Sequence, residues 1–269
     1  MLVLLSRDGQ MCNQLISLSS IYSLGIEYEQ AVKCPCMDSE LKKYFKFDAG
    51  SNDFCFEESK YSSIILKIIR FWNIFSKAKE FKHENTKKTF YFTKWLETLD
   101  HQIFYKHIDR IRSCFAFREE ILKEIENIFY SVKDPDSVTI GVHIRRGDYK
   151  EFNNGKWYYS DAEYAKIMLA VQEKMKKKVT FYICSNEKID LNYYKNRGLN
   201  IVRPGKTAID DLGILSLCDY IMGPPSTYSF WASLLGRNKR LIIDGCEKIY
   251  TLEDFETVDA RLERGETIQ

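Results

Sequence analysis

Five short, almost continuous apolar runs follow one another in the second half of the chain, and they restrict the fold more than any other feature. Runs of this length, rich in Val, Ile and Tyr, are typical of strands buried on both faces. Because helical patterns separate them, the sequence predicts a parallel, Rossmann-like sheet whose ligand lies beyond the carboxyl ends of its strands. The runs cover residues 138–144, 179–184, 199–202, 220–222 and 240–244.

The first half contains a weaker version of the same pattern. We expect a strand at 2–5, followed by a helix from Gln14 to about Leu24. In the second half, Ser160-Asp-Ala-Glu163 has the form of a capping box and should begin a helix that runs to about Lys178. A chain of 269 residues, at about 150 residues per domain, is long enough for two such α/β domains.

The domain boundary is expected just before the regular half, where Lys133-Asp-Pro-Asp-Ser interrupts the pattern. We therefore predict an N-terminal domain at 1–130 and a C-terminal domain at 131–269. The N-terminal domain contains a basic, aromatic helical insert at 61–123, which carries 13 Lys plus Arg and 7 Asp plus Glu, an excess of +6.

Within this insert, residues 63–77 form a helical pattern with an unusually wide apolar face. We favour a helix buried in its own domain, and the alternative is a helix that docks on an anionic membrane. The whole chain has a net charge of only +2, which excludes a global field that could hold a nucleic acid. An anionic ligand must therefore be held by a local cluster of cations.

Neither a signal peptide nor an apolar stretch long enough to span a bilayer is visible, so we expect a cytoplasmic protein, with the inner face of the plasma membrane as a peripheral site of action. The eight cysteines are then expected to be reduced thiols. Cys34-Pro-Cys36 has the wrong spacing for a zinc site, and we interpret these residues as ordinary thiols.

The most informative motif is His143-Ile-Arg145-Arg146-Gly147-Asp148-Tyr149, directly after the first strand of the regular half. Two adjacent guanidinium groups at the mouth of an α/β sheet suit a diphosphate, and the glycine allows a backbone to approach closely. The alternative is a solvated strand end with ordinary salt bridges.

Two further loops are candidates for ligand contact. The strand that ends at Met222 is followed by Gly223-Pro-Pro, and then Ser226 or Thr227 caps a helix that runs to Gly236. The N–H groups at such a helix start attract phosphate, although Ser and Thr caps are common. The third loop, 7–14, follows the first strand, and its Asp-Gly pair is also typical of a simple turn.

Several well-known motifs are absent. Gly205-Lys206-Thr207 has the end of a phosphate loop, but Asn200 stands where its first glycine belongs. The chain has no G-x-G-x-x-G, which argues against a dinucleotide enzyme, and we expect no metal requirement.

Together these residues resemble the α-1,2-fucosyltransferases of glycosyltransferase family 11. His143-Ile-Arg-Arg-Gly-Asp148 looks like the family's H-x-R-R-x-D, and Gly9-Gln-Met-Cys-Asn13-Gln is similar to its G-G-L-G-N-Q. The segment 184–187 resembles its F-S-D-D, 211–218 its D-L-x-x-M-S-x-C, and 225–232 its N-S-S-F-S-W-W-G-A. Cys12, Asn186, Glu187 and Pro225 depart from the family pattern.

The resemblance implies a GT-B-like α/β fold with two Rossmann-like domains whose parallel sheets face a central cleft. It implies that the N-terminal domain at 1–130 lies on the acceptor side and that the C-terminal domain at 131–269 binds the nucleotide sugar. It also implies inverting, metal-independent transfer of fucose from GDP-fucose to a glycan acceptor, which can be lipid-linked, in the synthesis of a surface polysaccharide. Arg145 would stabilise the departing diphosphate, with Asp148 in support. The implied donor contacts are His143, Arg146, Gly9, Asn13, Ser185, Asn186, Ser226, Thr227 and Ser229.

The group that accepts the proton of the acceptor hydroxyl is not marked by any motif. Asp8 and Glu151 are candidates by position, and a water is the alternative. Two other functions remain open: a different nucleotide-sugar transferase with the same diphosphate clamp, and a catalytically silent protein that binds a nucleotide sugar.

Overall fold

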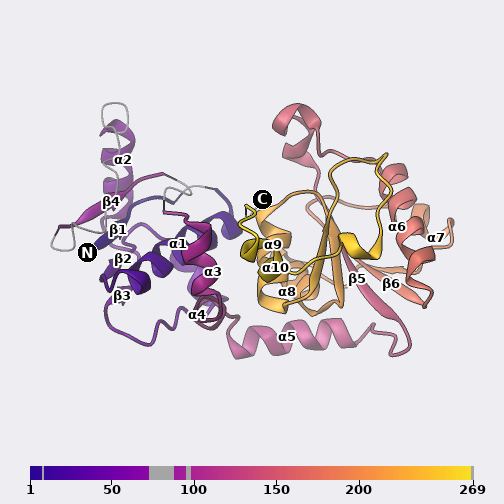
Figure 1. Ribbon diagram of the computed structural model, residues 1–269, viewed down its shortest axis with the longest axis horizontal. Coiled ribbons are helices and arrows are strands. Elements are labelled where there is room, and N and C mark those ends of the chain that lie inside the picture. Colours follow the sequence, from indigo (N-terminus) through magenta and orange to yellow (C-terminus); the bar gives the residue numbers. More distant parts are fainter. Residues whose placement is uncertain (8, 73–87, 95–97, 268–269) are drawn as a thin grey trace. The chain divides into compact units, whose positions relative to one another are not determined.

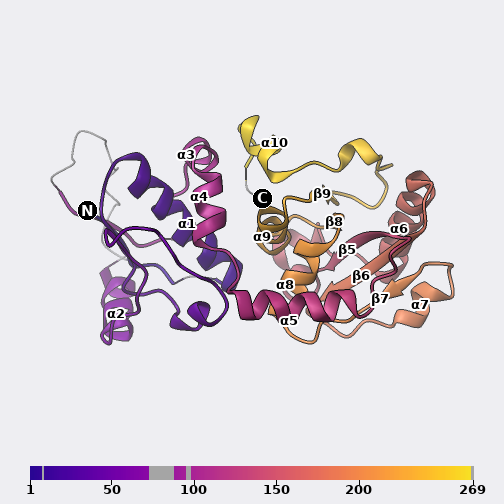
Figure 2. The same ribbon diagram turned by 90° about the horizontal axis from the view of Figure 1, so that it is seen from below.

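The computed structural model describes residues 1–7, 9–72, 88–94 and 98–267. It divides into two compact units, of which unit 1 comprises residues 1–118 and 265–267 and unit 2 comprises residues 119–264. Each unit contains a parallel β-sheet with its own helices (Figure 1, Figure 2). The predicted α/β fold with two parallel sheets is therefore confirmed. The division falls after Arg118, whereas the sequence placed it after residue 130.

Unit 1 has a four-stranded sheet in the order β3-β2-β1-β4. Its first strand, β1, pairs with β2 on one side and with β4 on the other, and every pairing is parallel. The described elements are β1 (Leu2–Leu4), α1 (Met11–Glu27), β2 (Val32–Lys33), η1 (Ser39–Lys43), β3 (Phe54–Cys55), α2 (Ser62–Trp72), β4 (Phe90–Phe92), α3 (His101–Lys106) and α4 (Ile108–Cys114).

Helix α1 is the predicted helix of the first half, and it is buried along most of its length. Its four serines are buried too, and three of them donate hydrogen bonds to carbonyls one turn earlier: Ser19 and Ser20 to Ile16, and Ser23 to Ser20. The fourth hydroxyl, Ser17 Oγ, is buried without a hydrogen-bond partner. The back-bonding of the other three satisfies hydroxyl groups that would otherwise be costly inside a protein. Helix α1 can therefore be buried along most of its length although serines stand among its apolar residues.

The basic segment 61–123 contains more than helices. Phe90-Tyr91-Phe92 forms β4, which pairs with β1 and belongs to the sheet. Aromatic residues fit a pleated surface, but three residues are too few for a recognisable period. Of the predicted helix at 63–77, residues up to Trp72 belong to α2, and residues 73–77 lie outside the described part. Ile64 and Ile68 on α2 are 54% and 52% exposed, so this face is not in a core.

Unit 2 has a five-stranded sheet in the order β7-β6-β5-β8-β9, again with only parallel pairings. The five predicted strands and the helix capped by Ser160 are all present. The described elements are α5 (Glu119–Tyr130), β5 (Val138–Ile144), η3 (Gly147–Lys150), η4 (Phe152–Gly155), α6 (Asp161–Met175), β6 (Val179–Ser185), α7 (Leu191–Lys195), β7 (Ile201–Val202), α8 (Ala208–Leu217), β8 (Tyr220–Gly223), α9 (Thr227–Gly236), β9 (Lys239–Ile242), η5 (Leu252–Asp254) and α10 (Val258–Glu263).

Strand β5 is the middle of this sheet and carries the Arg145-Arg146 pair at its carboxyl end. It pairs with β6 over its full length, from Val138 opposite Val179 to Ile144 opposite Ser185, and with β8 on its other side. Because β5, β6 and β8 are parallel, the loops that follow them all lie at the same edge of the sheet. Ligands bind at this edge in such sheets.

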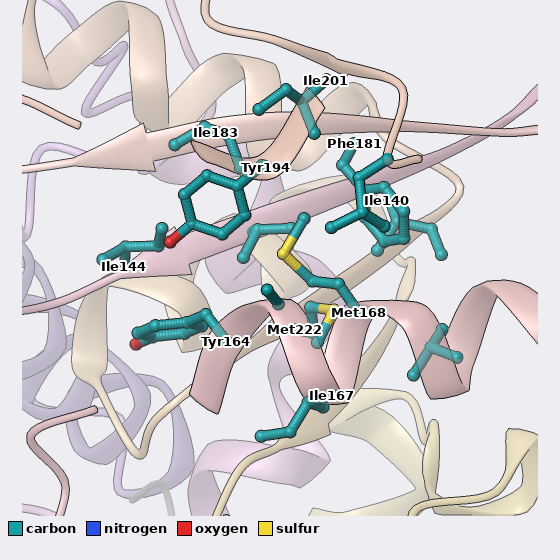
Figure 3. Packing of buried hydrophobic residues seen from close by; sticks show 14 of the residues in the cluster. Ile140, Ile144, Tyr164, Ile167, Met168, Phe181, Ile183, Tyr194, Ile201 and Met222 are labelled. Carbon is teal, nitrogen blue, oxygen red and sulfur yellow. The ribbon is translucent and has the colours of Figure 1, made fainter. Parts of the chain in front are cut away.

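The core of unit 2 lies between the sheet and α6 (Figure 3). Side chains of β5, β6 and β8 meet Tyr164, Ile167 and Met168 of α6, and all of these are at most 3% exposed. The apolar area removed from water here stabilises the fold at roughly 25 cal/mol per Å². A rigid sheet therefore supports the loops at its carboxyl edge.

Helix α5 belongs to unit 2 and holds the other side of it. Ile125 lies so close to Gly213 of α8 that a Cβ on that glycine would approach Ile125 Cδ1 to 2.4 Å. Phe129 stacks on Tyr182 of β6 with ring centroids 4.9 Å apart. Because Ile125 and Phe129 are almost fully buried, α5 is part of this core, which explains why the division lies before it.

All eight cysteines are free thiols. Burial raises the pKa of the Cys34 thiol well above its ordinary value, so this group is held in its neutral form. In the described part of the chain, no group of three or more His, Cys, Asp and Glu side chains could hold a metal ion. No helix among the described residues combines the length and the apolar character that crossing a membrane requires.

Candidate functional site

Arg145 follows β5 directly, and its guanidinium is held in place from two sides. Its Nη2 donates to Asp148 Oδ2 at 2.8 Å, and its Cζ lies 5.5 Å from the centroid of the Tyr149 ring. The Arg145 side chain is 16% exposed, whereas the Asp148 side chain is 59% exposed. The charge is therefore fixed in position but remains accessible to a ligand, as a diphosphate site requires.

Arg146 points elsewhere and is engaged within unit 2. Its Nη2 donates to Asp161 Oδ1 at 2.6 Å and its Nε donates to the Tyr159 carbonyl at 3.1 Å. The Tyr194 hydroxyl donates to the same Asp161 oxygen at 2.6 Å. This guanidinium thus ties the loop after β5 to the first turn of α6, and the two neighbouring arginines have different surroundings.

Gly147 makes the turn between Arg146 and Asp148 possible. Its φ of +63° lies in the left-handed region, and a Cβ there would approach Asn186 Nδ2 to 3.0 Å. Asn186 itself is hydrogen-bonded to the Arg146 backbone: its Oδ1 accepts from the Arg146 N–H at 3.2 Å and its Nδ2 donates to the Arg146 carbonyl at 3.4 Å. The loops after β5 and β6 are therefore joined by the Asn186 side chain, which holds the Arg146 backbone.

His143 lies inside the sheet and is 4% exposed. Burial, together with the nearby charges of Arg145 and Arg240, lowers the pKa of His143 to about 3. The imidazole is therefore neutral near pH 7, and its Nδ1 is a buried atom without a hydrogen-bond partner. A neutral imidazole adds no charge to the site.

The start of α9 lies next to the Arg145 loop. Ser226 caps this helix by accepting a hydrogen bond from the Tyr228 N–H at 3.2 Å, and Thr227 is its first residue. The Tyr149 hydroxyl donates to the Pro225 carbonyl at 2.7 Å, which connects the Arg145 loop to the residue before the cap. An N-terminus with a positive dipole end and the Arg145 guanidinium therefore converge at one edge of the sheet.

Arg240 of β9 was missed in the sequence. Its side chain is 3% exposed, and its Nη1 donates to the Ser226 carbonyl at 3.2 Å and to Ser229 Oγ at 3.3 Å. Burial lowers the pKa of Arg240 to about 9, so it is still charged near pH 7. A buried cation under the start of α9 adds positive potential to the edge that carries Arg145. The signal that could have identified Arg240 is its charge at the start of the run 240–244.

Asp211 begins the segment 211–218, which resembles a family motif, but the sequence indicated no role for it. It lies in the first turn of α8 and is 8% exposed, and its Oδ2 accepts from the Ser185 N–H at 3.2 Å. Its Oδ1 is buried without a partner and lies against Gly205. Burial raises the pKa of Asp211 to about 6, against the opposing effect of Arg203. A buried carboxylate oxygen of this kind is ready to accept N–H groups.

Ser185 and Glu151 have less specific surroundings. Ser185 Oγ accepts from the Glu187 N–H at 3.2 Å, within the same loop. Glu151 is an exposed residue at the end of η3. Neither contact distinguishes a ligand site from an ordinary loop.

The N-terminal loop belongs to unit 1. Gly9 has a φ of +79°, and its Cα is so close to Asn13 that an added Cβ would lie 2.4 Å from Asn13 Nδ2. The loop is thus folded against the first turn of α1. Asp8, the other candidate proton acceptor, lies outside the described residues. The roles of these residues stay predictions.

The comparisons with known proteins agree with this arrangement. Residues 70–257 match the model of "Glycosyl transferase family 11". The chain belongs to this family. It is therefore a glycosyltransferase, as the sequence predicted. No curated protein is similar enough in sequence to match the chain.

The solved structures that resemble the chain are fucosyltransferases. The α-1,6-fucosyltransferase NodZ, soaked with GDP-fucose, is 15% identical, with a TM-score of 0.60 over 90% of this chain and 94% of NodZ; another NodZ structure is from Bradyrhizobium. POFUT1 in complex with GDP-fucose is 8% identical, with a TM-score of 0.62 over 91% and 98%. A variant of Arabidopsis thaliana FUT1 in complex with GDP is 11% identical, with a TM-score of 0.57 over 90% and 69%. At these identities the likeness establishes the fold.

Proposed function

We propose that this glycosyltransferase moves fucose from GDP-fucose to a hydroxyl group of a glycan. The observation that carries the proposal is the convergence of the Arg145 guanidinium with the capped start of α9, linked by the hydrogen bond from Tyr149 to Pro225. Such an edge suits the diphosphate of a nucleotide sugar. Fucose and guanosine are supported by the likeness to three fucosyltransferases, two bound to GDP-fucose and one to GDP.

In the proposed reaction, the acceptor oxygen attacks the anomeric carbon on the face opposite the diphosphate. The bond from that carbon to the β-phosphate oxygen breaks, its electron pair leaves with GDP, and the configuration inverts. Arg145 neutralises the negative charge that grows on the leaving oxygen, and Asp148 fixes the guanidinium in place. The N–H groups of α9 near Ser226 and Thr227 share this task. These groups supply the charge stabilisation, so we propose that no metal is required.

We assign different roles to the other donor-site residues. Arg146 is proposed as a positioning residue that anchors the loop after β5, because its guanidinium is directed to Asp161. Arg240 and Ser229 hold the first turn of α9. Asp211 is proposed to accept a hydrogen bond from guanine through Oδ1, the oxygen without a partner, since Oδ2 already accepts from the Ser185 N–H.

The remaining elements of the reaction rest on the family resemblance. Gly9 and Asn13 are proposed to contact the donor from unit 1, His143 and Ser185 are proposed as further donor contacts, and Asp8 or Glu151 is proposed to accept the proton. The linkage is proposed to be α-1,2, whereas the similar NodZ is named an α-1,6 enzyme. Methylation analysis of the product distinguishes the two linkages.

We also propose a setting for the reaction, which is the synthesis of a surface polysaccharide on a lipid-linked acceptor at the cytoplasmic face of the membrane. Three exposed apolar side chains near the start of α2 support contact with lipid: Tyr61, Ile64 and Ile68, which are 55%, 54% and 52% exposed. Flotation with anionic vesicles at low salt tests it, and protein that stays at the bottom of the gradient contradicts membrane contact.

The donor assignment is tested with Arg145→Ala. We expect transfer from GDP-fucose to fall at least about 100-fold, because one preorganised charge on the leaving group is lost. The melting temperature should change little, since the carboxylate of Asp148 that pairs with Arg145 is exposed and such pairs contribute little to stability. Normal turnover by this variant would contradict the site.

The assignment of guanine as the nucleobase of the donor is tested by measuring the melting temperature of the wild-type protein with GDP, UDP, CDP or ADP. A ligand that binds only the native state raises the melting temperature, and GDP should raise it most. In Asp211→Asn the rise in melting temperature with GDP should exceed that with ADP by less, because the carboxylate that accepts from guanine is lost. A larger stabilisation by UDP would contradict the guanosine assignment.

A further inference from the structure

A cavity of about 510 Å³ lies in unit 2 at the carboxyl end of β9. One wall contains Pro225, whose carbonyl accepts from Tyr149 and whose neighbour Ser226 caps α9. The cavity therefore adjoins the proposed diphosphate site without including Arg145 or the cap. It is lined by Lys156, Trp157, Pro225, Leu241, Ile242, Asp244, Lys248, Glu253, Asp254, Glu256 and Arg261.

A row of aromatic rings leads from Arg145 to this cavity. The Tyr149 ring lies 5.3 Å from Phe152, and Phe152 lies 5.8 Å from Trp157, centroid to centroid. Phe152 is 52% exposed, so the row is not part of a closed core. Tyr149 and Trp157 are half-buried, so the row has one exposed ring between two that are partly accessible. The C–H face of a pyranose packs well on accessible aromatic rings.

The polar groups of the cavity are fixed in pairs. Asp244 Oδ1 accepts from Trp157 Nε1 at 2.9 Å and from Lys156 Nζ at 3.1 Å, and Lys248 Nζ lies 3.2 Å from Asp254 Oδ1. Hydrogen bonds from Trp157 and Lys156 lower the pKa of Asp244, which keeps this carboxylate ionised. The Trp157 ring is thereby held by its own polar edge, next to a carboxylate and an ammonium group.

The charges of the lining decide which kind of ligand fits. Four carboxylates face three cations, so the cavity has no excess of positive charge, in contrast to the edge that carries Arg145 and Arg240. A second phosphate would be repelled there. Alternating acceptors and donors around an aromatic ring instead suit a neutral ligand that has several hydroxyl groups.

We infer that this cavity binds a neutral pyranose unit of the acceptor glycan. The sugar ring packs on Trp157, and Asp244 and Lys156 hydrogen-bond to its hydroxyls, while the adjoining position of Pro225 directs the chain of the glycan toward Arg145. This inference rests on the proposed function, because it treats the neighbouring edge as the donor site.

Saturation-transfer-difference NMR on the full chain tests the inference with the methyl glycosides of galactose, N-acetylglucosamine and mannose. At least one glycoside should bind, and saturating GDP should leave its signals in place. In Trp157→Ala the affinity for that glycoside should fall about tenfold or more. Asp244→Asn, which keeps the ring, should weaken binding as well. Tyr130→Ala is the matched control, because Tyr130 is an exposed aromatic residue on α5, away from the cavity lining.

Each result has a defined meaning. GDP must still raise the melting temperature of both cavity variants, which shows that they are folded. The inference is overturned if no glycoside binds, if Trp157→Ala binds as well as Tyr130→Ala, or if GDP displaces the glycoside and so identifies the cavity as nucleotide space. If glycosides bind as expected but GDP binds nowhere, the proposed donor fails while the sugar cavity stands.

Discussion

His143 and Arg145 are two residues apart, one near the end of β5 and the other directly after it, yet they have opposite surroundings. His143 is buried and neutral, with its pKa lowered to about 3, whereas Arg145 keeps its charge at the accessible edge. Side chains two residues apart on a strand point to the same face, so the period of the strand does not separate them. The difference arises because β5 ends at Ile144 and Arg145 lies in the loop that follows. The strand thus presents one charge where two would repel.

The buried imidazole predicts a specific loss of stability in acid. A histidine whose native pKa lies below its unfolded value of 6.5 contributes its full stability above pH 6.5, and this contribution is lost as the pH falls toward 3. We expect the loss to reach about 3 kcal/mol at pH 4 for wild type and to be absent in His143→Gln. Urea unfolding at pH 7.5, 6, 5 and 4 measures both.

Asp211 titrates in the opposite sense in this range, because burial raises its pKa to about 6. Its protonation therefore favours the native state as the pH falls below 6. Wild type and His143→Gln both contain Asp211, so the difference between the pH dependences of their stabilities reports on His143 alone. Equal pH dependence in wild type and His143→Gln would contradict the assignment.

At the scale of elements, the loop between β5 and η3 depends on Gly147. Alanine at a φ of +63° costs about 1–2 kcal/mol, and its Cβ would also press on Asn186. We expect Gly147→Ala to lower kcat/KM about 10- to 100-fold, because a small displacement of Arg145 misaligns it with the leaving group. Steady-state kinetics with GDP-fucose measures the effect.

Gly198→Ala provides the control for backbone strain. Gly198 has a φ of +84°, and an added Cβ would have open space around it. This variant should lose a similar amount of stability and keep its kcat/KM. Equal activities in the two variants would mean that the Gly147 loop does not position Arg145.

The elements that the sequence predicted best are those with a strong period or a cap. The runs at 138–144 and 179–184 and the capping box at Ser160 correspond directly to β5, β6 and α6. Strand β4 was not predicted, because three aromatic residues are too few to show the period of a strand. Its partner β1 lies far away in the sequence, and such pairing leaves no local signal.

The candidate site was predictable to the same degree. The position of Arg145 at the end of a central strand follows from the motif and the topology. The engagement of Arg146 with Asp161 could not be predicted, because it depends on how α6 approaches the loop. Asp211 and Arg240 acquire their properties from burial, which residue type alone does not reveal.

At the scale of the whole molecule, the position of α5 predicts which fragments fold. A fragment of residues 119–264 should unfold cooperatively and be stabilised by GDP, since it contains the whole of unit 2. A fragment of residues 131–264 lacks Ile125 and Phe129, each of which contributes about 2 kcal/mol by burial, and should be markedly less stable or insoluble. Thermal melts with and without GDP compare them.

The control in this comparison is the full chain, whose unit 2 is intact. If residues 131–264 fold as stably as residues 119–264, then α5 is dispensable and the domain begins where the sequence placed it. If neither fragment folds, unit 2 requires unit 1, and the two units do not act as separate domains.

The pairing of β1 with both β2 and β4 has a consequence for synthesis on the ribosome. Leu2 pairs with Val32 and also with Phe90, so one edge of β1 has no partner until residue 90 has been made. At about 5–20 residues per second, that interval is roughly 4–18 s. An unpaired strand edge of this kind can recruit other nascent chains. We therefore expect β1 to depend on protection by a chaperone during translation until β4 has been made.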